Sequence, residues 1–186
     1  CAEILLKYDV SVVVITKSSL VLRDLDIWAE LNRKKRFLLM VSLTFSDEKI
    51  RNIFEPNAHP INKRIDTLHK FKDAGCFTGI LAMPLLPFIS ETEDNMIKIA
   101  EVAKTARVDF CMPGGLTLRP GVQKETFLEC IRNSFPHLLC EYERIYSENR
   151  QSGGASMEWR KSINPLYQKM VKTAGVPTEI PHYVFK

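Results

Sequence analysis

The chain has 186 residues, of which 45% are apolar and 26% are charged. This composition is typical of a soluble globular protein that builds one substantial core. No apolar run is long enough to span a bilayer, and the first residues lack the regions of a signal peptide, so we expect a cytoplasmic protein with no membrane partner. Its formal charge of +4 is compatible with a polyanionic partner but is too small to establish one.

The start of the sequence and its cysteines bear on what kind of chain this is. It begins with Cys1 rather than methionine, and residues 2–8 resemble the last turns of a helix without an N-cap, so we expect a piece of a longer protein. The cysteines are Cys1, Cys76, Cys111, Cys130 and Cys140. An odd number at wide spacing predicts neither a disulfide framework nor a metal site, but thiols in a reducing compartment.

A β-branched run, Val10 to Thr16, opens the first structural unit. It predicts a strand buried on both faces, as in a parallel α/β sheet. Because such proteins bind ligands in the loops at the carboxyl ends of their strands, Lys17 is the first candidate for a ligand contact. The alternative, that Lys17 is an ordinary surface lysine, stays open.

A second buried strand is predicted over residues 37–45. Strand alternation places Ser42 and Thr44 on one face near its carboxyl end, and Leu43 and Phe45 on the other. Two neighbouring hydroxyls there suggest hydrogen bonds to a ligand. Backbone satisfaction and β-propensity explain them equally well.

The next two units repeat this pattern. Ser46 is the expected N-cap of a helix through residue 54, and Ser90 that of a helix over 91–106, with Glu93 completing a capping box. A helix over 61–74 and strands over 77–83 and 109–112 fill the remaining positions. His59, between two prolines, is expected at the surface. Four strand–helix units predict a parallel α/β array, either an open sheet or part of an incomplete barrel.

The pattern changes after the fourth strand. Gly114 and Gly115 match neither a P-loop nor a dinucleotide fingerprint, although they allow a close backbone approach to a ligand. Helices are predicted over 124–146 and 158–173, joined by a Gly/Ser linker and followed by an extended tail. We therefore divide the chain into an α/β part, 1–121, and a C-terminal helical extension with its tail, 122–186.

Several stretches also carry a family resemblance. These stretches are VVVITKSSLVLRDLDIWAEL, the segment from MVSLTF through FEPNAHPINKRID to KDAG, GILAMPLLPFISE and LTLRPG. They resemble the later part of radical S-adenosylmethionine proteins of the spore photoproduct lyase-like, or DNA repair photolyase-like, group. The likeness extends to the tail GVPTEIPHYVFK. It implies the last four strands or so of a partial, six-stranded TIM-like barrel, whose N-terminal part is missing.

The resemblance implies two cofactors. Such lyase-like enzymes hold a 4Fe–4S cluster on a Cys-x3-Cys-x2-Cys loop and cleave S-adenosylmethionine reductively to a 5′-deoxyadenosyl radical. That cysteine loop is absent from this sequence, so we expect this chain alone neither to hold the cluster nor to catalyse. Nucleic acid, as in repair of DNA photoproducts, is the substrate that the group's name implies.

The resemblance also implies roles for particular residues. Lys17 would meet the methionine carboxylate of S-adenosylmethionine, and Ser42 with Thr44 would bind its ribose. The strand exits around Met83 and around Leu118 would form the wall of the adenine site. Arg119 would meet substrate or cofactor, or pair with a structural carboxylate.

Two other functions stay open at this point, a non-catalytic α/β binding or interaction module and a phosphate-binding barrel fragment. The latter ranks low because no glycine-rich anion cradle precedes a helix. The first strand also has a consequence for assembly. In a fragment the first strand would lack the strand that normally pairs with its free edge. We therefore expect this edge to be hidden, either by self-association or beneath the C-terminal helices.

Overall fold

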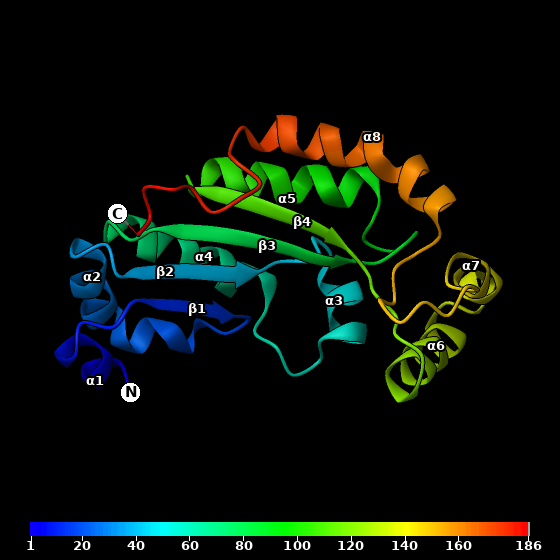
Figure 1. Ribbon diagram of the computed structural model, residues 1–186, viewed down its shortest axis with the longest axis horizontal. Coiled ribbons are helices and arrows are strands. Elements are labelled where there is room, and N and C mark those ends of the chain that lie inside the picture. The colour runs from blue at the N-terminus through cyan, green and yellow to red at the C-terminus, as the bar shows by residue number, and fades with distance from the viewer. Residues whose placement is uncertain (186) are drawn as a thin grey trace.

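Four parallel strands in the order β1-β2-β3-β4 form the sheet of the computed structural model, which describes residues 1–185 (Figure 1). This confirms the predicted α/β class and parallel array. The strands are β1 (Val12–Thr16), β2 (Phe37–Ser42), β3 (Thr78–Leu85) and β4 (Phe110–Gly115). Because spatial order follows chain order, each crossover steps to the next strand, and the sheet is an open, partial barrel.

Helices follow each strand, and more helices make up the C-terminal part. They are α1 (Ala2–Lys7), the 3-10 helix η1 (Ser19–Asp24), α2 (Leu25–Arg33), α3 (Glu48–Phe54), α4 (Ile61–Asp73), α5 (Glu93–Thr105), α6 (Val122–Ser134), the 3-10 helix η2 (Pro136–Leu138), α7 (Leu139–Ile145) and α8 (Met157–Ala174). No helix in residues 1–185 is both long and apolar enough to cross a bilayer.

The outer face of the sheet carries the main core. Alternate residues of β2, including Phe37, Leu39 and Val41, pack there against α2, α4 and α5. The ring of Phe37 lies between those of Trp28 and Phe71, with centroids 5.0 and 5.8 Å away. This apolar layer fixes the strands and therefore the positions of the loops at their carboxyl ends.

Two predicted helix caps are wrong by one or two residues. Asp47, not Ser46, caps α3, because its Oδ1 accepts from the amides of Lys49 and Ile50. Thr92, not Ser90, caps α5. The capping box with Glu93 is therefore wrong as well. Ser90 is buried instead, and its hydroxyl accepts from the Leu86 amide. Since serine, threonine and aspartate all cap helices well, only the path of the loop selects between neighbours.

The prediction that the first strand is buried on both faces is also wrong. Val13 is 45% exposed and Ile15 is 60% exposed, whereas every residue of β2 is buried. The reason is that β1 is an edge strand whose inner face meets no other segment of residues 1–185. The C-terminal helices do not cover its edge either, since α8 packs on α5 and β4 at the other side of the sheet (Figure 1). Self-association through this edge stays a prediction.

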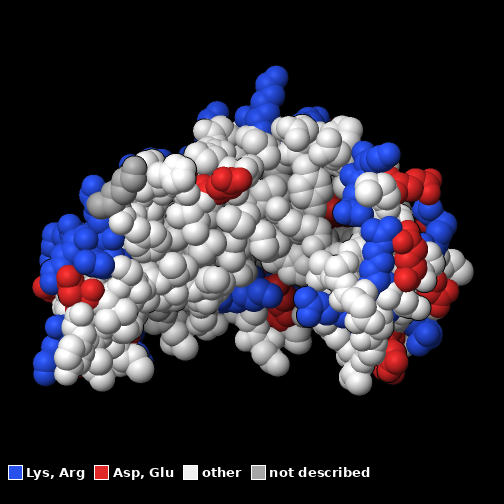
Figure 2. Space-filling view, in the orientation of Figure 1, with Lys and Arg blue, Asp and Glu red and all other residues white. Residues whose placement is uncertain are grey.

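The C-terminal tail covers the inner face near the amino ends of the strands. Val184 of the tail is fully buried there against Leu38 and Phe110. The Phe110 ring occupies the space where Gly79 lacks a side chain, since a Cβ at Gly79 would lie 2.2 Å from it. Figure 2 shows that the middle of this face carries mostly uncharged side chains. The inner face of β1, where Val13 and Ile15 are exposed, is therefore open and apolar.

Candidate ligand site at the carboxyl ends of the strands

A cavity of about 230 Å³ lies where the strands end. Three of the predicted site residues line it: Lys17 just after β1, Thr44 just after β2, and Leu118 after β4. The other lining residues are Phe45, Phe54, Glu55, Pro84, Leu86, Leu116, Gln123 and Phe127. The parallel sheet brings these loops together, and α6 contributes the last two side chains.

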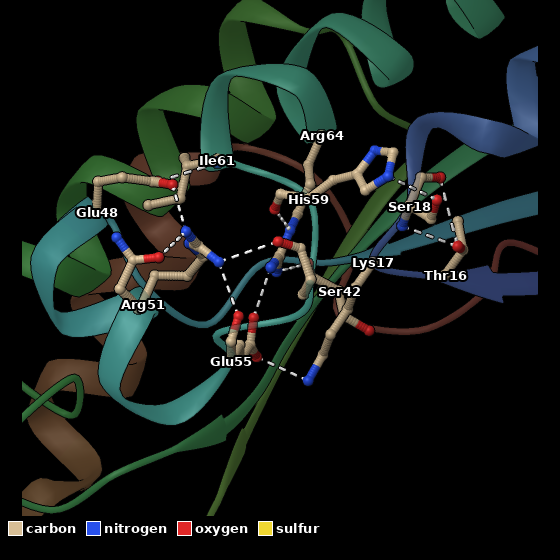
Figure 3. Close-up of polar contacts among 12 residues, drawn as sticks. Thr16, Lys17, Ser18, Ser42, Glu48, Arg51, Glu55, His59, Ile61 and Arg64 are labelled. Atoms are coloured by element: carbon tan, nitrogen blue, oxygen red, sulfur yellow. Dashed lines mark hydrogen bonds and ion pairs between the residues drawn. The ribbon is translucent and has the colours of Figure 1, made fainter.

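The cationic side of this cavity is an ion network. Lys17 Nζ lies 2.7 Å from Glu55 Oε1, and Arg64 Nη2 lies 2.6 Å from Glu55 Oε2 (Figure 3). The Glu55 side chain is only 8% exposed, while that of Lys17 is 40% exposed. One carboxylate thus holds two cations, and the network keeps a net positive charge. Lysine has three N–H donors, so Lys17 retains donors for a ligand.

Arg64 anchors this network to the sheet. It is fully buried on α4 and also donates to the carbonyls of His59, at 2.8 Å, and Ser42, at 3.1 Å. A planar guanidinium suits such multiple contacts because its donors point in fixed directions. Arg64 therefore joins the end of β2, the loop before α4 and the carboxylate that holds Lys17.

His59 lies at the surface, as predicted, but it also makes specific contacts. It is half-buried, and its Nδ1 accepts from the Ser19 amide at 3.1 Å and lies 2.7 Å from the Ser19 hydroxyl. A backbone amide can only donate, so Nδ1 is the unprotonated nitrogen of this ring. Ser18 lies 3.4 Å from Nε2 (Figure 3). Two of the stretches that carry the family resemblance, TKSS and FEPNAHP, thus meet in space.

Arg51 and Glu48 hold the loop of residues 55–60 in place. Arg51 Nη1 donates to the carbonyls of Glu55 and Ala58, at 2.7 and 3.0 Å, and Glu48 accepts from the Ile61 amide at 3.1 Å. Neither residue touches the cavity. They fix the backbone from which Glu55 and His59 project.

Thr44 is the most unusual wall residue. It is 1% exposed, and its Oγ1 has no hydrogen-bond partner in residues 1–185. Its carbonyl is satisfied by Asn95 Nδ2 at 3.0 Å. A buried hydroxyl without a partner is costly, so its presence in a cavity wall fits a ligand that supplies one.

The other predicted site residues do not line this cavity. Ser42 is the buried last residue of β2, and Met83 is half-buried among the apolar residues of the inner face. Arg119 is exposed and forms no ion pair within residues 1–185. The sequence-based analysis missed Glu55, Arg64 and His59. The signal that could have found them is their place in the distinctive FEPNAHP…KRID stretch.

All five cysteines are free thiols, and residues 1–185 contain no group of three His, Cys, Asp or Glu that could hold a metal ion. Burial raises the pKa of Cys76 to about 11 and that of Cys111 to about 12. A cluster binds thiolates, which these two buried residues do not form readily. The side chains in this part of the chain therefore do not fit a 4Fe–4S cluster.

The fold and the site define a class, namely a parallel α/β protein with a partial barrel and a ligand cavity at the carboxyl edge. Comparison with solved structures narrows this class of protein. The fold matches a cysteine-to-serine mutant of spore photoproduct lyase with a TM-score of 0.61 and 18% identity, over 87% of this chain and 48% of that one. A structure of spore photoproduct lyase complexed with dinucleoside spore photoproduct matches with a TM-score of 0.59 and 16% identity over the same shares.

Sequence comparison adds curated relatives without assigned functions, and no family model matches. Uncharacterized protein ORF301 of Acidianus two-tailed virus is 37% identical over 79 residues, which cover 42% of this chain and 26% of the relative. Uncharacterized protein Rv2578c of Mycobacterium tuberculosis is 23% identical over 157 residues, which cover 84% of this chain and 46% of the relative. The chain thus spans half or less of the relatives it matches.

Proposed function

We propose that this chain is the carboxyl-side part of a radical S-adenosylmethionine enzyme and that it binds S-adenosylmethionine at the open edge of its sheet. The observation that carries the proposal is the convergence on one cavity of Lys17 and of Thr44, whose buried hydroxyl has no partner in residues 1–185. A lysine beside a buried, unsatisfied hydroxyl suits a ligand with a carboxylate and ribose hydroxyls. The fold shared with spore photoproduct lyase supports the same assignment.

The residues present fit this cofactor. Lys17 would bind its carboxylate, Thr44 its ribose, and Leu118 would contact its adenine. Ser42 and Met83 lie outside the cavity, so they would be reached only by the part of the ligand that extends onto the inner face. The cavity of about 230 Å³ is smaller than the roughly 300–1,000 Å³ usual for ligand sites, so the open inner face near Ile15 would take the rest. Beside a cluster held by another part of the protein, S-adenosylmethionine supplies one-electron radical chemistry.

Within this scheme the chain's own residues position and shield the ligand. Glu55, itself held by Arg64, keeps Lys17 at the cavity, so the ammonium group of Lys17 does not need to be ordered on binding. Phe54 and Phe127 form an apolar wall with rings 6.1 Å apart. Such a wall excludes water, which strengthens the contact between Lys17 and a carboxylate.

The test uses a longer protein that contains this sequence and a reconstituted cluster. Lys17→Ala is expected to weaken S-adenosylmethionine binding about ten- to a hundredfold by calorimetry, since a charge-assisted hydrogen bond is lost. The matched control is Lys63→Ala, an exposed lysine of α4, which should bind normally. Unchanged affinity in Lys17→Ala and in Thr44→Val would refute the site.

A nucleic-acid substrate is part of this proposal and rests on the fold neighbour bound to a dinucleoside photoproduct. The distribution of basic residues gives a nucleic-acid substrate little support. The exposed basic run of residues 33–36 lies at the amino end of β2, and Figure 2 shows blue side chains gathered on that side, away from the cavity. Anisotropy of a labelled DNA strand at several salt concentrations tests it, since phosphate contacts give a salt-dependent affinity. Absence of binding at low salt would count against DNA.

A non-catalytic binding module is the second candidate, because the cysteines described above do not suit a cluster. Anaerobic reconstitution of the longer protein with iron and sulfide separates the two. Four irons per chain with charge-transfer absorption support the enzyme, whereas an iron-free protein that still binds a ligand supports the module.

A further inference from the structure

A second and larger cavity lies on the other side of the β4 exit. Its volume is about 470 Å³, and its walls come from the loop after β3, the end of β4, the linker and α8. We call it the Glu91 cavity. Its lining includes Glu91, Gly115, Tyr146, Trp159, Arg160 and Tyr167. None of the functions considered above uses it.

Glu91 is a buried acid without a counter-charge. It is 5% exposed, its Oε1 accepts from the Tyr167 hydroxyl at 2.6 Å, and its Oε2 accepts from Trp159 Nε1 at 2.8 Å. Both donors are neutral, and no Lys, Arg or His of residues 1–185 pairs with it. Burial raises the pKa of Glu91, and the two hydrogen bonds oppose this only in part. Buried carboxylates are normally paired, so this one lacks a cation.

Glycine keeps the space beside this carboxylate open. A Cβ on Gly115 would lie 3.4 Å from Glu91 Oε1 and 3.3 Å from the Tyr167 hydroxyl. Gly115 ends β4 and does not have a positive φ, so its backbone does not require glycine. The missing side chain therefore leaves room for a group that contacts the carboxylate.

The remaining walls restrict what that group can be. Trp159, Tyr146 and Tyr167 give the cavity an aromatic lining, and aromatic rings attract ammonium groups. Arg160, one turn before Asn164 on α8, brings an exposed guanidinium to the same cavity and forms no ion pair in residues 1–185. It repels a bare cation and attracts an anionic group. One carboxylate and one guanidinium within one cavity match a ligand that carries both charges.

We propose that the Glu91 cavity binds a small zwitterionic amine, with its ammonium group on Glu91 and its anionic group on Arg160. The volume falls within the range usual for small-molecule sites, roughly 300–1,000 Å³. The site is separate from the one around Lys17 and does not depend on radical chemistry.

Calorimetric titration with ω-amino acids of increasing length tests this on the full 186-residue chain. The probes are 3-aminopropanoate, 4-aminobutyrate and 6-aminohexanoate, with butylamine and butyrate as single-charge controls. At least one zwitterion is expected to bind ten times more tightly than either control, because only it satisfies both side chains. Equal binding of butylamine or butyrate, or binding of none of the three zwitterions to the folded chain, would overturn the proposal.

Variants then locate the binding. Glu91→Gln and Arg160→Gln should each weaken it at least tenfold, while Glu143→Gln, an exposed acid of α7, should leave it unchanged. Because Glu91 also ties α8 to the loop after β3, its variant could lose the fold. Gly115→Ala removes no hydrogen-bonding group and adds one methyl group beside the Glu91 carboxylate and the Tyr167 hydroxyl. Its circular dichroism should stay normal while binding falls at least tenfold, and full affinity in this variant would refute the site.

Discussion

Glu55 and Glu91 are both buried carboxylates near the carboxyl ends of the strands, but their partners differ. Glu55 lies between Lys17 and Arg64, so two cations balance one negative charge. Glu91 accepts hydrogen bonds from Tyr167 and Trp159 only, and its charge stays unbalanced. The first arrangement leaves positive charge for an anionic ligand, and the second leaves negative charge for a cationic one. Two neighbouring cavities on one sheet edge are thus prepared for opposite groups.

The largest effect is expected where the Glu55 network is broken. Arg64→Met should lower the free energy of unfolding by about 3–5 kcal/mol, since a buried carboxylate loses a cation and two carbonyls lose their donor. Urea denaturation followed by circular dichroism measures this. Arg107→Met, which removes an exposed pair with Asp73, is the control and should change stability by less than about 1 kcal/mol. Equal effects would show that the buried network is unimportant for folding.

Glu91 should make the free energy of unfolding depend on pH. Its pKa is raised by burial, so the folded chain holds this proton more tightly than the unfolded chain does. The resulting stabilisation is fully present below the ordinary pKa of 4.5 and is lost as pH rises through the raised value. Glu91→Gln should therefore gain stability relative to the parent chain between pH about 4 and about 7.

Thermal unfolding at several pH values, with Glu143→Gln as the exposed control, checks this slope. A constant difference between Glu91→Gln and the parent over that pH range would mean that Glu91 has an ordinary pKa in the folded chain.

Thr44 offers a smaller change of unusual sign. Thr44→Val replaces an unpartnered buried hydroxyl, so we expect it to raise the free energy of unfolding by about 1 kcal/mol. Thr67 is an equally buried threonine whose hydroxyl donates to the Lys63 carbonyl at 2.7 Å. Thr67→Val should therefore lower stability by about 1 kcal/mol in the same denaturation experiment. Loss of stability in both variants would indicate that the Thr44 hydroxyl has a partner.

The smallest expected effect on stability is at Lys17. Its side chain is 40% exposed, and Arg64 continues to balance Glu55 without it, so Lys17→Ala should change the free energy of unfolding by less than about 1 kcal/mol. A loss of several kcal/mol would make Lys17 a structural residue and would weaken its assignment as a ligand contact.

The sequence by itself determined the class of fold. β-branched runs at regular spacing, each followed by a helix, are compatible with few folds other than a parallel α/β array. The apolar periods that mark the strands and the helices are both local features of the sequence. It also placed Lys17, Thr44 and Leu118 at strand exits. Parallel strands end at one edge, so these residues share a cavity once the strands pair in order.

Only the tertiary structure decided which charges meet. Glu55 follows Lys17 by 38 positions along the chain, and Trp159 follows Glu91 by 68, and no local pattern specifies contacts over such separations. The burial of β1 depended on its neighbours in the same way: its residues suit a covered strand, but at the edge of the sheet one face meets no other segment of residues 1–185. Local periodicity shows which face of a segment is apolar, whereas the path of the chain decides what that face contacts.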